Sequence, residues 1–399
     1  TDSPHTAGPS DASTSDVRIE SLVSATPVLG LSPNIALGDV IATRDLQIDS
    51  AKAVTTGALM AGRDVAVLGR GGPTPGSSDH TGAGVTIASA HAGDDVVAFS
   101  IFGHAHITGD VTSGQPFARL VPTNDRTIDG ATEAADQLAI YLHYFDLDEA
   151  SSPYVLKGGV IHLAGVGVEV GGALKAVGAD SDIRLRSSGD ITVTGDSTAG
   201  HQAVFQTDAG VGGSVKVGAV TAGDSILLDG AAGADGVGAA STGVLTATNG
   251  DVAVQARSGT INLGGASAGD DVVVRGPAQV TITGPVSAGG GADSSGYADG
   301  LVTTDGAVSL EGKSFDLTGH DIDIKGAAVT TTATMTATGA QSDVRVQTPG
   351  AVNLADAGAG RDVLVDGGGS VQTGALSAGR DVGVRSTGLG TDVTVGGAA

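Results

Sequence analysis

Apolar and polar residues alternate with a period of two in short runs along much of the chain. Clear examples are Val65 and Val67, Val272 and Val274, and Val382 and Val384. This alternation predicts short β-strands that bury one face. Gly-rich or Asp-Gly segments separate the runs, so we expect a turn close to each strand end.

One phrase, Ala-Gly-x-Asp followed by an alternating strand, recurs along the chain. Its copies begin at Ala61, Ala92, Ala268, Ala359 and Ala378, and a variant copy at Ala222 reads Ala-Gly-Asp-Ser. Where the repeat is cleanest, its aspartates are 19 residues apart, as from Asp343 to Asp362 and on to Asp381. A unit this short cannot bury its own apolar face, whereas stacked copies do so while each backbone pairs with the next. The sequence therefore predicts an all-β fold, a parallel β-solenoid (parallel β-helix) with coils of about 19–22 residues.

The composition agrees with a narrow solenoid interior. Aromatic residues make up 3% of the 399 residues, with no Trp, while 66 residues are Gly. Hydrophobic residues still reach 40%, which argues against a disordered chain. With no Cys, disulfides and thiolate metal sites are excluded.

The repeated aspartate allows two interpretations. A stacked row of carboxylates could bind cations, or each carboxylate could cap a corner by accepting hydrogen bonds from nearby backbone N–H groups. In the second interpretation, which we favour, Arg63, Arg361 and Arg380 partly offset the stacked negative charge.

The step of nearly 19 residues, seen best in GSVQTGALSAGRDVGV from Gly369 to Val384, resembles the repeats of filamentous-haemagglutinin-like exoproteins. This resemblance implies a right-handed parallel β-helix that serves as an extracellular or cell-surface adhesin or fibre. The N-terminal secretion domain of that family has no clear match here. An internal fragment or processed product of a longer adhesin is therefore one expectation.

We expect four regions. Residues 1–15 form a flexible N-terminal arm, and residues 16–102 form solenoid coils. Residues 103–158 form an insertion with one helix at about 131–149, because the repeat disappears there and aromatic residues gather. Residues 159–399 return to solenoid coils.

Charge and motifs narrow the function. The formal net charge of −24 disfavours nucleic acid as a partner, and no apolar run is long enough for an integral membrane segment. No nucleophile, cofactor or phosphate-binding motif occurs, so we predict no catalytic, cofactor-binding or metal site and no cofactor. His104 and His106 form an H-x-H pair, but no carboxylate stands at convincing spacing beside them in the sequence.

The expected function is a non-enzymatic extracellular structural or adhesive rod. It would stack end to end into a filament and could bind a glycan or surface protein; a β-helix polysaccharide lyase or glycosidase is the enzymatic alternative. The candidate partner-binding residues in the insertion are Tyr141, His143, Tyr144 and Phe145. The candidate end-to-end assembly residues are Val17, Ile19, Val382, Val384, Val393 and Val395.

Overall fold

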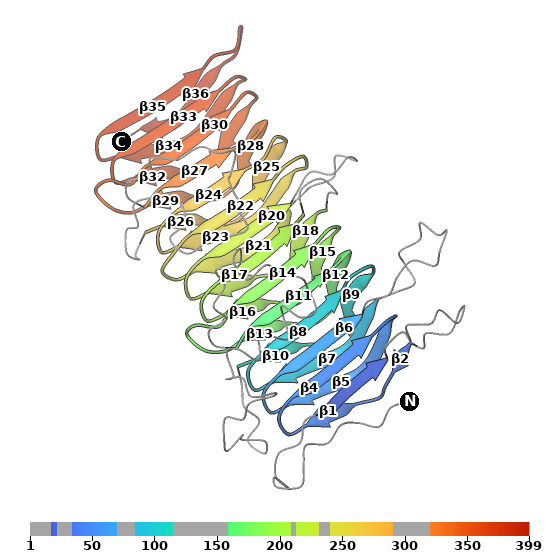
Figure 1. The fold of residues 1–399 in the computed structure, drawn as a ribbon. Coiled ribbons are helices and arrows are strands. Elements are labelled where there is room, and N and C mark those ends of the chain that lie inside the picture. The colour runs from blue at the N-terminus through green and yellow to red at the C-terminus, as the bar shows by residue number, and fades with distance from the viewer. Residues whose placement is uncertain are drawn as a thin grey trace, which may run out of the picture. The chain divides into compact units, whose positions relative to one another are not determined.

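The computed structural model describes residues 17–21, 34–69, 84–114, 159–208, 213–230, 240–289 and 320–398. These residues form β-strands and turns, and they contain no helix long and apolar enough to cross a membrane. Backbone contacts divide the chain into two compact units, one up to Leu185 and one from Arg186. Each unit is a parallel β-solenoid, as predicted, with its strands stacked coil on coil (Figure 1).

In the first unit, one sheet takes a single strand from each coil. Its strands are β1 (Val17–Ser21), β4 (Leu46–Ser50), β6 (Val65–Gly69), β8 (Val96–Ser100) and β11 (Ile161–Gly165). The second sheet takes one long strand or two short ones per coil. Its strands are β2 (Ile35–Ala36), β3 (Val40–Ala42), β5 (Val54–Ala61), β7 (Val85–Ala92), β9 (His104–Ile107), β10 (Val111–Ser113), β12 (Gly167–Val170) and β13 (Leu174–Ala176). The boundary between the two units lies within β14 (Ile183–Ser187).

The second unit repeats this plan. Its one-strand sheet contains β17 (Ala203–Thr207), β20 (Ile226–Gly230), β22 (Val252–Ala256), β24 (Val272–Arg275), β27 (Ile322–Lys325), β30 (Val344–Thr348), β33 (Asp362–Gly367) and β35 (Asp381–Ser386). Its other sheet contains β15 (Ile191–Val193), β16 (Ser197–Ala199), β18 (Val215–Val217), β19 (Val220–Ala222), β21 (Ala240–Ala247), β23 (Ile261–Ala268), β25 (Gln279–Ile282), β26 (Val286–Ala288), β28 (Ala328–Thr331), β29 (Met335–Ala337), β31 (Val352–Leu354), β32 (Ala357–Ala359), β34 (Val371–Ala378) and β36 (Val393–Ala398).

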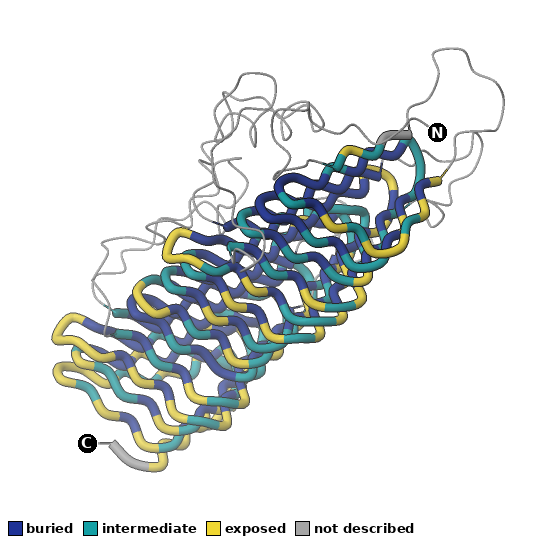
Figure 2. Tube along the Cα trace, turned by 90° about the horizontal axis from the view of Figure 1, so that it is seen from below, coloured by how far each residue is buried: buried dark blue, intermediate teal, exposed yellow. Residues whose placement is uncertain are grey.

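The strand register follows the sequence repeat. Val344 pairs with Val363 and Val363 with Val382, and each step is 19 residues (363 − 344 and 382 − 363). Because the register stacks equivalent residues of successive coils, the alternate apolar side chains of each strand face the interior together. Along β30 the burial alternates: Val344 and Val346 are fully buried, whereas Arg345 and Gln347 are more exposed. Figure 2 shows this alternation of buried and exposed positions along the coils.

The solenoid extends further into the predicted insertion than expected. Residues 103–114 belong to the coils, since β9 pairs with β7 and β12, and β10 pairs with β7 and β13. The boundary predicted at Gly103 is therefore too early. The alternation Ala105, Ile107 and Val111 is short and was not recognised as strand, although all three side chains are buried.

A second interruption was not predicted. Val272 of β24 pairs directly with Ile322 of β27, although 50 residues separate them (322 − 272). The uninterrupted run of coils expected over residues 159–399 is therefore broken between these strands. The predicted arm over residues 1–15 and helix at about 131–149 lie outside the described residues.

Candidate functional site

The aspartates of the Ala-Gly-x-Asp repeat, together with aspartates at the same position in coils that vary this phrase, form a buried ladder in each unit. Each stands at the start of a strand in the one-strand sheet, so stacking brings successive aspartates together. Their side chains are almost fully buried: Asp45, Asp64 and Asp95 in the first unit, and Asp251, Asp271, Asp321, Asp343 and Asp362 in the second.

Most ladder carboxylates hold the backbone of the following coil. Oδ1 of Asp271 accepts a hydrogen bond from the amide N–H of Asp321 at 2.6 Å, and Oδ1 of Asp321 accepts one from the amide of Asp343 at 2.6 Å. In the first unit Oδ1 of Asp64 accepts from the amide of Asp95 at 3.1 Å. The predicted corner-capping role is thus confirmed, with the refinement that the capped N–H belongs to the next coil.

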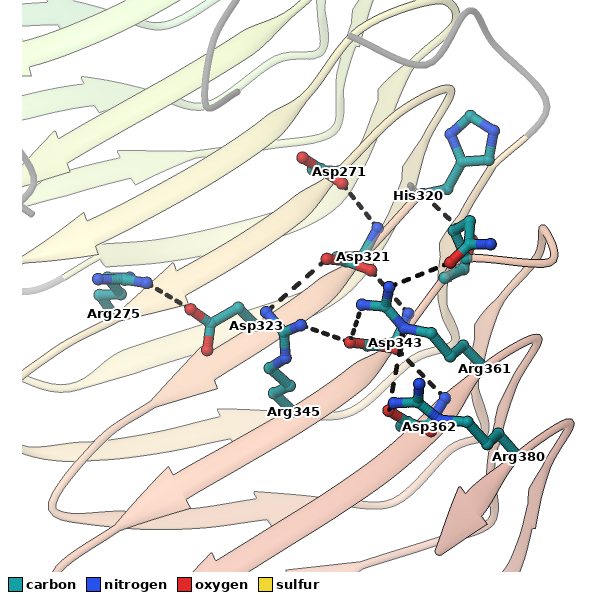
Figure 3. A network of polar contacts seen from close by, with 12 residues as sticks. Asp271, Arg275, His320, Asp321, Asp323, Asp343, Arg345, Arg361, Asp362 and Arg380 are labelled. Carbon is teal, nitrogen blue, oxygen red and sulfur yellow. Dashed lines mark hydrogen bonds and ion pairs between the residues drawn. The ribbon is translucent and has the colours of Figure 1, made fainter. Parts of the chain in front are cut away.

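Arginines partly neutralise the ladder. The guanidinium of Arg361, in the position before Asp362, donates to both carboxylate oxygens of Asp343 at 2.7 and 2.6 Å (Figure 3). Arg380 makes the same paired contact with Asp362, and Arg63 makes it with Asp45. The predicted charge compensation is confirmed: each arginine binds the aspartate of the preceding coil.

Neighbouring groups set the charge state of the ladder aspartates. Burial raises the pKa of Asp321 to about 6, although the Asp343 amide and Arg345 oppose the rise. Burial also acts on Asp343, but the hydrogen bonds and charges of Arg361 and Arg345 outweigh it, so the pKa of Asp343 is lowered. Asp343, which contacts two arginines, is therefore more firmly ionised than Asp321.

The ladder changes where the repeat reads Ala-Gly-Asp-Asp. There an aspartate, Asp94 or Asp270, replaces the arginine, and three carboxylates gather in each place: Asp64, Asp94 and Asp95, and Asp251, Asp270 and Asp271. Burial, followed by the charges of Asp270, Asp251 and Asp321, raises the pKa of Asp271 to about 8, against an opposing hydrogen bond from the Asp321 amide. The sequence interpretation treated all repeat copies alike and missed this difference.

Two further polar contacts join residues far apart in sequence. His106 Nδ1 lies 2.9 Å from Oε2 of Glu169, because β9 and β12 place these residues in register. His320 Nδ1 lies 3.2 Å from Oδ1 of Asp270, although 50 residues separate them. Glu169 thus places a carboxylate beside the H-x-H pair, next to which the sequence shows no carboxylate. Only the coil register could have revealed either partner.

The predicted assembly residues lie on the first strand and the last two strands of the described part of the chain. Val382 in β35 and Val393 and Val395 in β36 are 38%, 46% and 36% exposed. Val384 is half-buried, as are Val17 and Ile19 in β1. The predicted partner-binding residues lie outside the described residues; they are Tyr141, His143, Tyr144 and Phe145.

One open concavity of about 440 Å³ lies along the second unit. Its lining is Gly276, Pro277, Lys325, Gly326, Ala327, Gln347, Thr348, Pro349, Asp366, Gly368 and Thr387. Asp366 is the single carboxyl in this lining and is held by Arg385, so the lining offers no pair of converging catalytic carboxyls.

These features define the class of protein as a parallel β-solenoid with a buried aspartate ladder. No protein-family model, curated protein or solved structure matches the chain.

Proposed function

We propose that the chain is a non-enzymatic structural or adhesive β-solenoid, located outside the cell or on its surface, that stacks end to end through its terminal coils. Its finer assignment is to the filamentous-haemagglutinin-like exoproteins. The 19-residue register through β30, β33 and β35 supports that assignment, since it keeps the step on which the resemblance rests.

The apolar edge of the last described coil carries this proposal. Val382 continues the buried row of Val363, and Val393 continues that of Val371, yet Val382 and Val393 are exposed. Among the described strands, β35 pairs with β33 alone and β36 with β34 alone. Their outer edges would be covered by a strand of another coil, which adds backbone hydrogen bonds as well as apolar contacts.

A second copy of the chain has a matching edge in β1. Val17 and Ile19 stand in register with the buried Leu46 and Ile48, and among the described strands β1 pairs with β4 alone. Joining the β1 edge of one copy to the β35 edge of another is a head-to-tail contact, which repeats without closing and yields a filament. The sequence-based alternative, a fragment of a longer adhesin, would cover the same edge with the next coil of its own polypeptide.

The polar residues of the described coils support a structural role over acid–base chemistry. Hydrolysis of glycosidic bonds commonly uses two carboxyls beside a substrate groove. The ladder carboxyls are instead buried and hold backbone amides and guanidinium groups. On this proposal, acidic polysaccharides incubated with the protein yield no new reducing ends or unsaturated products.

Electron microscopy and light scattering of purified protein test the stacking. We expect concentration-dependent filaments from the wild type and short particles from Val382→Pro or Val384→Asp, because the first removes a ladder N–H and the second places a charge on the apolar edge. Val244→Asp is the matched control, since Val244 is exposed on β21, away from the terminal strands. Unchanged filament length in both edge variants, with their coils still folded by circular dichroism, would overturn the proposal.

A further inference from the structure

The position before the ladder aspartate determines how each coil balances its buried charge. Where it is Arg361, two carboxylates, Asp343 and Asp362, surround one guanidinium, at 2.6 and 3.9 Å. In the coil of Asp271 the same position holds Asp270. The positive guanidinium found at this position in the arginine-bearing coils is thus replaced by a third carboxylate.

The three carboxylates converge instead of turning apart. Asp251, Asp270 and Asp271 are each 1% exposed or less, and one oxygen from each lies within 4.8 Å of an oxygen from the other two. Oxygen ligands 2.3–2.6 Å from a shared ion are at most about 5 Å apart, so this spacing fits a common Ca²⁺ ion. Like charges buried at such distances are unfavourable unless a cation or protons neutralise them.

One ligand oxygen remains available in this buried cluster. Oδ1 of Asp271 holds the amide of Asp321, but Oδ2 is buried without a hydrogen-bond partner. Figure 3 shows the second oxygen of Asp271 turned away from Asp321. The amide N–H of Asp271 itself donates to Oδ1 of Asp251 in the preceding coil, so the two residues are direct neighbours. An unmatched carboxylate oxygen beside two further carboxylates is the arrangement that a hard cation would complete.

We propose that Asp251, Asp270 and Asp271 bind one divalent cation of the calcium type, which takes the place of the guanidinium found in the arginine-bearing coils. The ion joins two successive coils, because Asp251 belongs to one and Asp270 and Asp271 to the next.

Neighbouring groups define the limits of the site. His320, the equivalent residue in the following coil, lies against Oδ1 of Asp270 and orients that carboxylate. The cluster of Asp64, Asp94 and Asp95 differs because Arg63 lies 3.3 Å from Asp64 and supplies a positive charge. The proposal is therefore confined to the cluster in the second unit.

Calcium binding to the full chain tests the site. Protein stripped with a chelator is titrated with CaCl₂ by calorimetry and equilibrium dialysis, with MgCl₂ and ionic-strength-matched NaCl as comparisons. Asp270→Arg restores the Ala-Gly-Arg-Asp repeat, so it should fold while supplying its own cation. Asp270→Asn removes a ligand, and Asp356→Asn is the charge-matched control, because Asp356 is an exposed cap of the Ala375 amide.

We expect Asp270→Arg and Asp270→Asn each to bind one Ca²⁺ per chain fewer than the wild type and Asp356→Asn. Without calcium, Asp270→Arg should melt at a higher temperature than the wild type. Equal calcium stoichiometry in the wild type and Asp270→Arg would overturn the proposal. So would a folded wild type that takes up no divalent cation, since protons alone would then neutralise the cluster.

Discussion

The guanidinium of Arg361 keeps the buried carboxyl of Asp343 ionised. It donates two hydrogen bonds to that carboxylate, and with Arg345 it lowers a pKa that burial alone would raise. Removing one partner of a buried pair leaves a charge without full compensation. Because Arg345 remains, we expect Arg361→Met to lower the free energy of unfolding at neutral pH by about 2 kcal/mol, measured by urea denaturation.

Arg385→Met is the matched comparison for this pair. Arg385 also makes two contacts with one aspartate, Asp366, but its side chain is 69% exposed. Exposed pairs contribute little because water and salt screen them. A loss of stability in Arg385→Met as large as that in Arg361→Met would contradict the role assigned to burial.

Asp64 has the opposite titration behaviour. Burial, followed by the charges of Asp95, Asp45 and Asp94, raises its pKa well above the ordinary value of 3.8, and Arg63 only partly opposes this. A raised folded-state pKa means that the folded protein holds the proton more tightly than the unfolded chain does. The stability contributed by this group is complete below the ordinary pKa and is lost as the pH rises through the folded-state pKa.

Asp64→Asn should therefore become more stable relative to the wild type as the pH rises, because the amide stays neutral. Thermal melts of both proteins across the pH range, with chelator present, measure the difference. Asp190→Asn, which changes an exposed cap of the Ser214 amide, provides the control. A constant difference between wild type and Asp64→Asn would contradict the raised pKa.

At the scale of the element, the glycine of the repeat sets how closely two corners approach. A Cβ on Gly360 would lie 1.7 Å from the carbonyl oxygen of Gly339 in the preceding coil, whereas one on Gly358 would meet only the Ser377 hydroxyl at 3.2 Å. Gly360→Ala forces the corners apart, and we expect a loss of about 1–3 kcal/mol in calorimetric melts. Gly358→Ala should cost less; equal losses would show that the corner does not limit the stacking.

The elements that the sequence predicts best are those where the repeat is local. Val363 and Val382 could be placed on stacked strands because their 19-residue step recurs without interruption. Asp270 and His320 could not be placed together, since 50 residues separate them and the period is lost there. Whether two residues are neighbours in a solenoid depends on how many residues lie between two stacked strands. The alternation of apolar and polar residues does not predict that number.

The individual aspartates of the ladder show the same limit of sequence-based prediction. The Ala-Gly-x-Asp pattern predicted a corner cap, and Asp64 and Asp271 act as such. The consequence of replacing Arg by Asp before Asp271 depends on which carboxylate of the preceding coil faces it. That neighbour is known only once Val252 and Val272 are in register.

At the scale of the whole molecule, stability should be local along each solenoid. The strand register joins β33 to β30 on one side and to β35 on the other, so a coil depends directly on its nearest neighbours. Val365 in β33 is 2% exposed. Val365→Asp buries an unpaired charge and should raise amide hydrogen exchange in β30, β33 and β35, while β20 and β22 in the same unit keep their protection.

Leu364→Asp separates this effect from the added charge itself. Leu364 is the neighbouring residue on the same strand, but it points outward and is 42% exposed, so its replacement should leave exchange nearly unchanged throughout the unit. A single cooperative core would respond differently, because unfolding one coil would expose all of them. Exchange that rises equally in β20, β22 and β33 of Val365→Asp would therefore show that the second unit unfolds as one body rather than coil by coil.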